Sequence, residues 1–579
     1  MMELRVWAPA AGAVEVQAGG ARHAMRSEDG GWWSASVDVV PGADYGFCLD
    51  GRDPLPDPRS PWQPSGVHGL SRVVDHSAYP WSDAGWRGRP LASGVVYELH
   101  TGTFTPEGTF DAAVDRLDHL VRLGITHVEL LPVVQFPGDR GWGYDGVDLY
   151  APHESYGGPD GLKRLVDACH SRGLGVILDV VYNHLGPAGN YLASYGPYFT
   201  DRYATPWGQA VNLDGPGSPE VRAFLVDNAL MWLRDYHCDG LRLDAVHAIL
   251  DASAVHLLEE MQERVEELAA HLDRHLFLIA ESDLNDPRVV NRREVGGYGL
   301  AAQWSDDFHH ALHAALTGER DGYYADFGSL AHLAAALREA FVYAGTYSAY
   351  RDRIHGRPAV GVPGYRFLGY LQNHDQVGNR AVGERSSALI APELLKVAAA
   401  LVLTSPFVPL LFMGEEWGAT SPFLYFTSHE DPDLGRAVSE GRTHEFAAFG
   451  WDPATIPDPQ DPATFERSKL DWSELEEQPH ADLLEWHRRL IELRRTTPAL
   501  TDGRLDRVAV DYDEGERWIT VERGPVTIAC NLSKAEVEVP LDRSHASAIL
   551  LTSGKEPRVS EGTARLEPRS VTIWGPRVP

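Results

Sequence analysis

Short segments that alternate apolar and polar residues occupy the first ninety positions of the chain. They lie at residues 4–9, 14–17, 33–39 and 45–53, and glycine and proline interrupt them. A period of two is typical of strands that bury one face. We therefore predict an N-terminal β-sandwich of immunoglobulin-like form over residues 1–90.

From Gly94 the pattern changes to apolar strand segments that alternate with amphipathic helical segments. The strand segments lie at residues 95–99, 128–131, 176–181, 241–244, 277–281, 301–304, 370–373 and 408–413. Such alternation indicates a parallel sheet, and this number of repeats indicates closure into a barrel. We therefore predict an α/β fold with a (β/α)8 TIM barrel over residues 91–500.

Two barrel helices can be placed from their spacing of apolar residues. The first covers residues 110–123 and has an apolar face of Val114, Leu117, Leu120 and Val121. The last covers residues 481–495.

Two connections within the predicted barrel are long. Residues 184–217 follow the third strand and count as an insertion, and residues 414–457 follow the eighth strand. Long loops at the carboxyl ends of barrel strands shape substrate access.

Alternation with a period of two returns near the end of the chain. It occupies residues 508–512, 518–521, 526–530 and 570–574. We predict a C-terminal antiparallel β domain over residues 501–579.

Charge and cysteine content narrow the class of protein. The 579 residues carry a net charge of -32, which disfavours nucleic acid or an anionic membrane as a partner. The four cysteines lie far apart and form neither a metal-ligand pattern nor a disulfide framework. No signal peptide or long apolar stretch is visible, so we expect a cytoplasmic protein without nucleic-acid or membrane partners.

Acidic residues lie at or near the carboxyl ends of four of the predicted strands. They are Asp179, Asp244, Glu281 and Asp375. The carboxyl ends of barrel strands carry the active sites of TIM-barrel enzymes, and clustered acids there suit the cationic transition state of glycoside cleavage. Arg242 shares a strand face with Asp244 and can keep it ionised; the alternative is an Arg–Asp pair that only caps the barrel.

These four segments, at residues 176–184, 240–247, 276–281 and 368–375, resemble in type and order the motifs of the α-amylase superfamily of retaining glycosidases. The resemblance implies that Asp244 is the nucleophile, Glu281 the acid/base and Asp375 the stabiliser of the transition state. It also implies a set of substrate-binding residues, namely Tyr144, Asp179, His184, Arg242, His247, His374 and Arg380.

Asn183 matches a calcium-ligand position of many amylases. The loop that follows lacks an Asp cluster able to complete an oxygen cage, so we predict no metal and no cofactor.

Three further stretches resemble the trehalohydrolases of this superfamily that act on maltooligosyltrehalose. They lie at residues 55–69, 302–310 and 422–429, with Ser305 where the resemblance leads us to expect Asn. The implied reaction hydrolyses the α-1,4 bond next to trehalose, and the implied pathway partner is an enzyme that forms maltooligosyltrehalose.

Asp306, Asp307 and His310 follow the sixth strand and are our candidates for contacts with the departing trehalose. The alternative is that the two acids only cap a helix N-terminus.

Two other functions stay open at this point. One is a glycogen branching or debranching enzyme, or a general α-glucan hydrolase, of the same superfamily. The other is a catalytically silent glucan-binding protein, which would tolerate loss of the acids that this chain retains.

Overall fold

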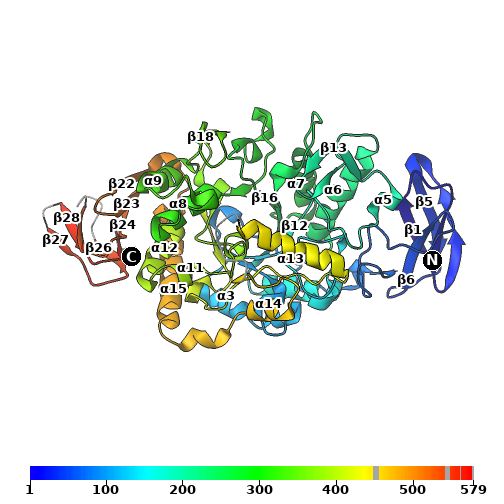
Figure 1. Cartoon of the computed structure of the whole chain (residues 1–579), viewed down its shortest axis with the longest axis horizontal. Helices are drawn as coiled ribbons and strands as arrows, with labels where there is room; N and C mark the ends of the chain where they lie inside the picture. The colour runs from blue at the N-terminus through cyan, green and yellow to red at the C-terminus, as the bar shows by residue number, and fades with distance from the viewer. Residues whose placement is uncertain (448–454, 542–547, 561, 577–579) are drawn as a thin grey trace.

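The computed structural model describes residues 1–447, 455–541, 548–560 and 562–576. A large central body carries a small β structure at each end, the N-terminal one at the right and the C-terminal one at the left of Figure 1.

The central body is a closed barrel of parallel strands, as predicted. In barrel order the strands are β8 (Val96–Leu99), β9 (His127–Leu130), β12 (Gly175–Val180), β15 (Gly240–Leu243), β16 (Phe277–Ala280), β17 (Ala302–Trp304), β20 (Phe367–Gly369) and β21 (Val408–Phe412). Strand β21 pairs with β8 and closes the ring. The (β/α)8 prediction is therefore confirmed.

Residues two apart on each strand share a face, and this sorts the barrel interior into an apolar and a polar part. The apolar part is a cluster that includes Val96, Ile177, Ile279, Trp304 and Leu368. Two positions further along these strands the inward residues become polar. They include Glu98, Asp179 and Glu281. The polar part thus lies toward the carboxyl ends of the strands, where barrel enzymes hold their active sites.

Helices surround the barrel. The longer ones that follow its strands are α4 (Gly158–Ser171), α6 (Ser218–Arg234), α7 (Leu257–Leu272), α8 (Asp306–Thr317), α9 (Leu330–Glu339), α12 (Pro392–Leu403) and α15 (His480–Thr496). Helix α15 matches the predicted last helix to within one residue at each end. Helix α13 (Pro432–Ala447) comes from the connection after β21 and crosses the front of the barrel in Figure 1. Part of that connection, residues 448–454, lies outside the described residues.

The predicted helix at residues 110–123 is wrong as a single element. The chain forms α2 (Phe110–Val114) and, after a break at Asp115 and Arg116, α3 (Leu117–Leu123). The break rotates the face that α3 turns toward the core, so Leu117 and Leu120 are buried while Val121 is exposed.

The predicted seventh strand at residues 370–373 is also wrong, since β20 ends at Gly369. The residue paired with Gly369 on β21 is Pro409, which has no N–H to continue the ladder. Asn373 instead caps α10 (His374–Gly378), where its side chain accepts hydrogen bonds from the backbone N–H groups of Asp375 and Gln376.

Two antiparallel sheets form the N-terminal β-sandwich, which is confirmed. One contains β1 (Met2–Trp7), β5 (Trp32–Val37) and β4 (Arg26–Ser27). The other contains β3 (Ala21–Ala24), β2 (Val14–Ala18), β6 (Asp44–Leu49) and β7 (Ser71–Arg72). Their inward residues, among them Val6, Val16 and Phe47, are almost fully buried.

Arg59 joins this sandwich to the barrel. Its Nη1 donates to the Tyr150 hydroxyl and to Asp227 Oδ2, each at 2.9 Å. Residues 55–69, one of the stretches that carry the resemblance to trehalohydrolases, therefore include a joint between the two parts of the molecule.

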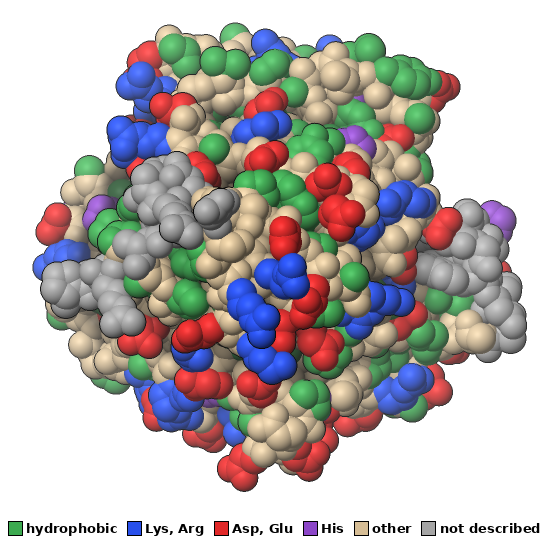
Figure 2. Space-filling view, turned by 90° about the vertical axis from the view of Figure 1, so that its left-hand side faces the viewer, with side chains coloured by type: hydrophobic (Ala, Val, Ile, Leu, Met, Phe, Trp, Pro, Cys, Tyr) green, Lys and Arg blue, Asp and Glu red, His purple; other side chains and the backbone are tan. Residues whose placement is uncertain are grey.

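The C-terminal β structure is confirmed as antiparallel. A sheet of β22 (Val508–Asp513), β23 (Trp518–Arg523), β24 (Val526–Asn531), β29 (Ser570–Gly575) and β26 (Ala548–Thr552) stands beside a second of β25 (Val537–Pro540), β28 (Thr563–Leu566) and β27 (Arg558–Ser560). Arg523 fastens the larger sheet to the barrel, because its Nη1 donates to the Thr404 carbonyl at the end of α12 at 2.6 Å. Figure 2 looks onto this end of the molecule, where acidic and basic side chains intermingle.

The insertion after β12 contains α5 (Leu192–Tyr195) and a hairpin of β13 (Phe199–Thr205) and β14 (Gly208–Val211). In the described part of the chain, none of the helices combines the length and apolarity needed to cross a bilayer. The domain limits at residues 90 and 500 stay a proposal.

Candidate active site

Arg242 organises the polar end of the barrel interior. Its Nη1 donates to Asp179 Oδ2 at 2.7 Å and to Asp244 Oδ1 at 2.8 Å, and its Nη2 forms an ion pair with Glu281 Oε2 at 3.0 Å. The guanidinium is fully buried and also lies over the Trp304 ring, with Cζ 4.3 Å from the ring centroid. One cation therefore gathers carboxylates from the ends of three adjacent strands, β12, β15 and β16.

Asp244 and Glu281 are each held by a second donor. The Asn183 side-chain amide donates to Asp244 Oδ2 at 3.0 Å, and the backbone N–H of Ala245 donates to Glu281 Oε2 at 2.7 Å. Ala245 can do so because its backbone turns left-handed immediately after the strand, with φ 38° and ψ 52°. A non-glycine residue in this conformation is strained, and such strain is common where a chain aims functional groups.

Asp375 is the most accessible of the three predicted catalytic acids. Its side chain is 37% exposed, against 11% for Asp244 and 16% for Glu281. It lies on α10 directly after His374, whose Nε2 is 3.5 Å from Asp375 Oδ1. The structure therefore brings all three acids to one end of the barrel, with Asp375 at its opening.

Tyr144 connects two of the predicted substrate-binding residues. Its hydroxyl donates to Asp179 Oδ2 and contacts His374 Nε2, both at 2.7 Å, and its ring stacks on the His374 ring. Burial raises the pKa of Asp179 to about 7 even though Arg242 opposes the rise. Burial would lower the pKa of His374, but Glu98 and Asp375 outweigh it and raise the value to about 9.

His184 lies on the side of the site that faces the insertion. Its Nδ1 is 2.5 Å from Asn183 Oδ1, and its ring stacks flat on Trp207, at 4.5 Å between centroids and 4° between planes. Trp207, in the turn between β13 and β14, is 47% exposed. The insertion therefore presents an aromatic surface next to a predicted sugar contact.

Asp306 begins α8 and lies next to the acids on the other side of the site. The Tyr370 hydroxyl donates to its Oδ1 at 2.5 Å. Burial and then the Glu281 charge raise the pKa of Asp306 to about 7. His310, one turn further on, packs flat against Tyr323, and its Nδ1 is buried without a hydrogen-bond partner among the described residues.

Two of the predicted substrate-binding residues, Asp307 and Arg380, bind other parts of the protein with their side chains. Asp307 Oδ2 accepts hydrogen bonds from the side chain of Asn285 and from the backbone N–H groups of Val342 and Tyr343, at 2.7–2.9 Å. Neither Asp306 nor Asp307 caps the helix with its side chain, although both lie in the first turn of α8. Arg380 forms a two-pronged pair with Glu319, at 2.9 Å for each nitrogen. A direct role for Asp307 or Arg380 in substrate binding stays a prediction.

His247 belongs to a charged group at the edge of the site. Its Nδ1 lies 4.0 Å from Asp283 Oδ1, and Arg351 donates to Asp283 Oδ2 at 3.3 Å. Ser305, where Asn was expected, donates its hydroxyl to the Ala340 carbonyl at 3.2 Å.

Two acids were not predicted from the sequence, namely Glu98 and Glu129, which lie on apolar strands and point into the barrel. They face each other in register on β8 and β9. They could have been identified because each is a charged residue at an inward position of a barrel strand. Trp207 and Tyr323 were not predicted either, because no spacing rule distinguishes them from the many aromatic residues of the core.

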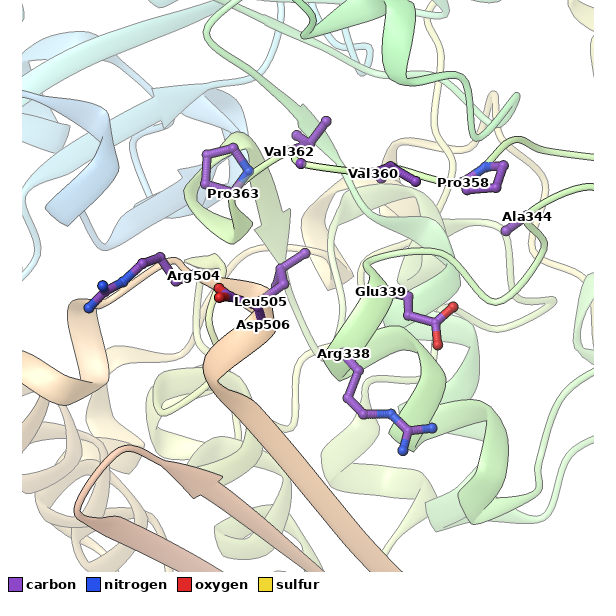
Figure 3. Close-up of a pocket in the computed structure, with 12 residues that line it drawn as sticks. Arg338, Glu339, Ala344, Pro358, Val360, Val362, Pro363, Arg504, Leu505 and Asp506 are labelled. Atoms are coloured by element: carbon purple, nitrogen blue, oxygen red, sulfur yellow. The ribbon is translucent and has the colours of Figure 1, made fainter.

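A separate cavity of about 450 Å³ lies away from these acids. Figure 3 shows it between Arg338 and Glu339 of α9, the loop at residues 358–363 and the segment of Arg504, Leu505 and Asp506. The loop leads directly into β20, so the cavity lies near the amino end of that strand, opposite the polar end of the barrel. It does not belong to the candidate active site.

Comparison with known families matches two parts of the chain. The catalytic domain of alpha amylase matches residues 78–201, and a domain of unknown function, DUF3459, matches residues 503–573.

Comparison with curated proteins gives relatives over almost the whole length. The malto-oligosyltrehalose trehalohydrolase of Arthrobacter ramosus is 55% identical, with 92% of this chain and 93% of the relative covered. Those of Rhizobium sp. (strain M-11) and Saccharolobus solfataricus are 53% and 44% identical, with 98% and 89% of this chain and 96% and 88% of the relatives covered. A 1,4-alpha-glucan branching enzyme of Bacillus caldolyticus is 34% identical over 48% of this chain and 46% of its own.

Comparison with solved structures gives similar proteins as well. A Salmonella typhimurium protein, provisionally named an alpha amylase, superposes with a TM-score of 0.91 at 41% identity, and 99% of this chain and 97% of that one are covered. A pullulanase from Anoxybacillus sp. LM18-11, at 20% identity and a TM-score of 0.71 with 99% and 85% covered, shares the fold. By its sequence over nearly its full length, the chain belongs to the malto-oligosyltrehalose trehalohydrolase family of glycoside hydrolases.

Proposed function

We propose that this enzyme hydrolyses the α-1,4 bond between trehalose and the maltooligosaccharide of maltooligosyltrehalose, with retention at the anomeric carbon. The main support for the catalytic roles is the buried guanidinium of Arg242, which holds Asp244 and Glu281 side by side. Retaining glycosidases need two carboxyl groups only about 5–5.5 Å apart, whereas inverting enzymes leave room for a water between them.

In the first step Asp244 attacks the anomeric carbon of the glucose unit bonded to trehalose. Glu281 donates its proton to the glycosidic oxygen, so trehalose leaves with an intact hydroxyl and a glucosyl ester forms on Asp244. Asp375 stabilises the positive charge that develops on the ring, since it lies at the opening of the site and is free to contact sugar hydroxyls.

In the second step Glu281, now a carboxylate, takes a proton from a water molecule. The water attacks the anomeric carbon, the ester bond to Asp244 breaks and the maltooligosaccharide leaves as the α-anomer. The backbone N–H of Ala245, 2.7 Å from Glu281 Oε2, keeps this side chain oriented during both steps.

Asp306 and His310 line the side of the site that we assign to trehalose. Trehalose lacks a reducing end, so an enzyme must recognise it through hydroxyl groups beyond the scissile bond. The carboxyl of Asp306 and the unpartnered Nδ1 of His310 provide hydrogen-bonding atoms for this purpose. A cytoplasmic location and an enzyme partner that supplies maltooligosyltrehalose complete the proposal.

The test is product analysis on maltotriosyltrehalose. We expect trehalose and maltotriose as the products, with the maltotriose first appearing as the α-anomer in proton NMR spectra. Initial formation of the β-anomer would contradict the assignment of Asp244 as nucleophile.

A branching activity is the second candidate, since part of the chain is similar to a branching enzyme. Incubation with glycogen distinguishes the two. A trehalohydrolase leaves the proportion of α-1,6 linkages unchanged, whereas a branching enzyme raises it.

A further inference from the structure

Two glutamates inside the barrel have no part in the mechanism given above. Glu98 on β8 and Glu129 on β9 are paired in register and are each only 1% exposed. Among the described residues, neither carboxylate oxygen of Glu129 has a hydrogen-bond partner. Both oxygens of Glu98, in contrast, are bound to one residue of the site.

That residue is His374. Its ring Nδ1 lies 2.5 Å from Glu98 Oε1, and its backbone N–H donates to Glu98 Oε2 at 3.0 Å. The two contacts fix both the backbone and the ring of the residue that precedes Asp375. We propose that Glu98 is a positioning residue, which holds His374 as an imidazolium with its second N–H directed at Tyr144 and the site of the reacting sugar.

The hydrogen-bond geometry determines where the protons lie. The Tyr144 hydroxyl has one proton and donates it to Asp179 Oδ2 at 2.7 Å. At its 2.7 Å contact with His374 Nε2 the hydroxyl must therefore accept, so Nε2 carries a proton. Because Nδ1 donates to the Glu98 carboxylate, both ring nitrogens are protonated and the ring is positively charged.

The charged groups around His374 support this state. Besides Glu98, the ring faces Glu129 on β9, Asp179 on β12, Arg242 on β15 and Asp375 on its own helix. His100 is a further neighbour, and burial lowers the pKa of that imidazole to about 4, which leaves it neutral.

The two glutamates differ in their charge. Burial and then the nearby Glu98 raise the pKa of Glu129 well above its usual range, and among the described residues neither of its oxygens has a hydrogen-bond donor that would stabilise a charge. Glu98, whose two oxygens both contact His374, is the member of the pair that we assign as its counterion. Substitution of glutamate by glutamine thus removes a charge at position 98 but none at position 129, which gives a matched control on the adjacent strand.

The consequence for the reaction is indirect. A charged, fixed His374 presents an N–H donor 3.5 Å from Asp375 Oδ1 and beside Tyr144. This arrangement orients the residues that meet the sugar hydroxyls without contact between Glu98 and the substrate. The inference rests on the proposed catalytic roles, because it needs a working site around His374.

The experiment compares E98Q, E98D, E129Q and H374N, alone and as the E98Q/H374N pair, with maltotriosyltrehalose as substrate. We expect E98Q to lower kcat/KM about 10- to 100-fold, the size of loss known for the outer hydrogen-bond partners of metal-binding histidines. E98D keeps the charge and should recover part of the activity, and E129Q should remain within about twofold of the parent. In the H374N background, E98Q should cause no further loss.

Proton NMR of the hydrogen-bonded imidazole of His374 measures a signal that would stay unchanged if the role of Glu98 were purely structural. We expect a downfield Nδ1–H resonance in the parent and in E129Q that is absent from E98Q and H374N and that moves upfield as the pH rises through about 9, where the ring loses its Nε2 proton.

Equal losses from E98Q with and without His374, or equal losses from E98Q and E129Q, would overturn the inference. Retention of the downfield resonance in E98Q would do the same. A parent enzyme that releases no trehalose would instead contradict the proposed function, so the two failures are distinguishable.

Discussion

At the residue scale, one buried arginine explains most of the site. A guanidinium that is removed from water needs several partners, and Arg242 has Asp179, Asp244, Glu281 and the Trp304 ring. A plain Arg–Asp pair, the alternative left open by the sequence, would not draw a carboxylate from each of three strands.

Asp244→Ala should abolish turnover, because it removes the carboxylate that we propose forms the glucosyl ester. We expect kcat/KM to fall on the order of 10⁴-fold or more. Binding of maltooligosaccharide, measured by calorimetry, should persist. Substantial residual hydrolysis by this variant would mean that Asp244 is not the nucleophile.

The pH dependence of KM in Asp306→Asn tests the proposed contact between Asp306 and trehalose. With a pKa raised to about 7, Asp306 is protonated below that pH and loses its charge as a partner for sugar hydroxyls. The parent should therefore show a KM for maltotriosyltrehalose that rises as the pH falls through 7. In Asp306→Asn the KM should be about tenfold higher above pH 7, and this dependence should vanish.

The control for this prediction is maltopentaose, which lacks trehalose. A change of the same size in KM for maltopentaose would show that Asp306 does not distinguish trehalose.

At the element scale, the repeating strands and helices could be predicted from the sequence, whereas local breaks and early strand ends could not. Seven of the strands, and the gathering of Asp179, Asp244 and Glu281 at their carboxyl ends, followed from apolar runs that end in polar residues. The break at Asp115 and Arg116 and the early end of β20 at Gly369 did not, because a local helix phase and the pairing of Gly369 with Pro409, which has no N–H, depend on neighbouring elements. Trp207 was missed for a related reason, since only the hairpin fold of the insertion places it on His184.

Trp207→Ala should weaken binding of substrate without a change in the chemistry. A half-exposed aromatic ring beside a sugar site supplies stacking area, whose loss costs about 1 kcal/mol or more. We expect KM for maltotriosyltrehalose to rise about fivefold to tenfold while kcat changes by less than about twofold. A fall in kcat with an unchanged KM would assign Trp207 to the reaction step.

At the scale of the whole molecule, a buried network joins the segment before the barrel to its strands. His170 Nδ1 lies 2.8 Å from Asp83 Oδ2, and its Nε2 lies 3.0 Å from Asp239 Oδ2. Trp86 and Arg274 donate to the other oxygen of Asp239. This network and Arg59 hold the β-sandwich and its connecting segment in fixed positions on the barrel.

His170→Gln should destabilise the fold by about 3 kcal/mol near pH 6, because it removes a charged partner from buried carboxylates. Although burial opposes it, Asp239 and Asp83 raise the pKa of His170, so its contribution is full below about 6.5 and lost as pH rises through the raised value. The His170 and His237 contacts hold the pKa of Asp83 below its usual range against burial, and that contribution is lost in acid.

Denaturation by urea at several pH values measures this effect. The difference between parent and variant should be largest between about pH 4 and pH 6.5 and smaller in alkali. A difference that does not vary with pH would mean that His170 acts by packing alone.

The central claim is that this enzyme recognises trehalose and does not merely cleave α-1,4 bonds. The most direct measurement is kcat/KM for maltotriosyltrehalose and for maltopentaose, side by side, with products identified by chromatography. We predict a ratio of at least about 100, equivalent to roughly 2.7 kcal/mol of transition-state discrimination, and trehalose as a product of the first substrate. Equal values for the two substrates would contradict the account and leave a general α-glucan hydrolase.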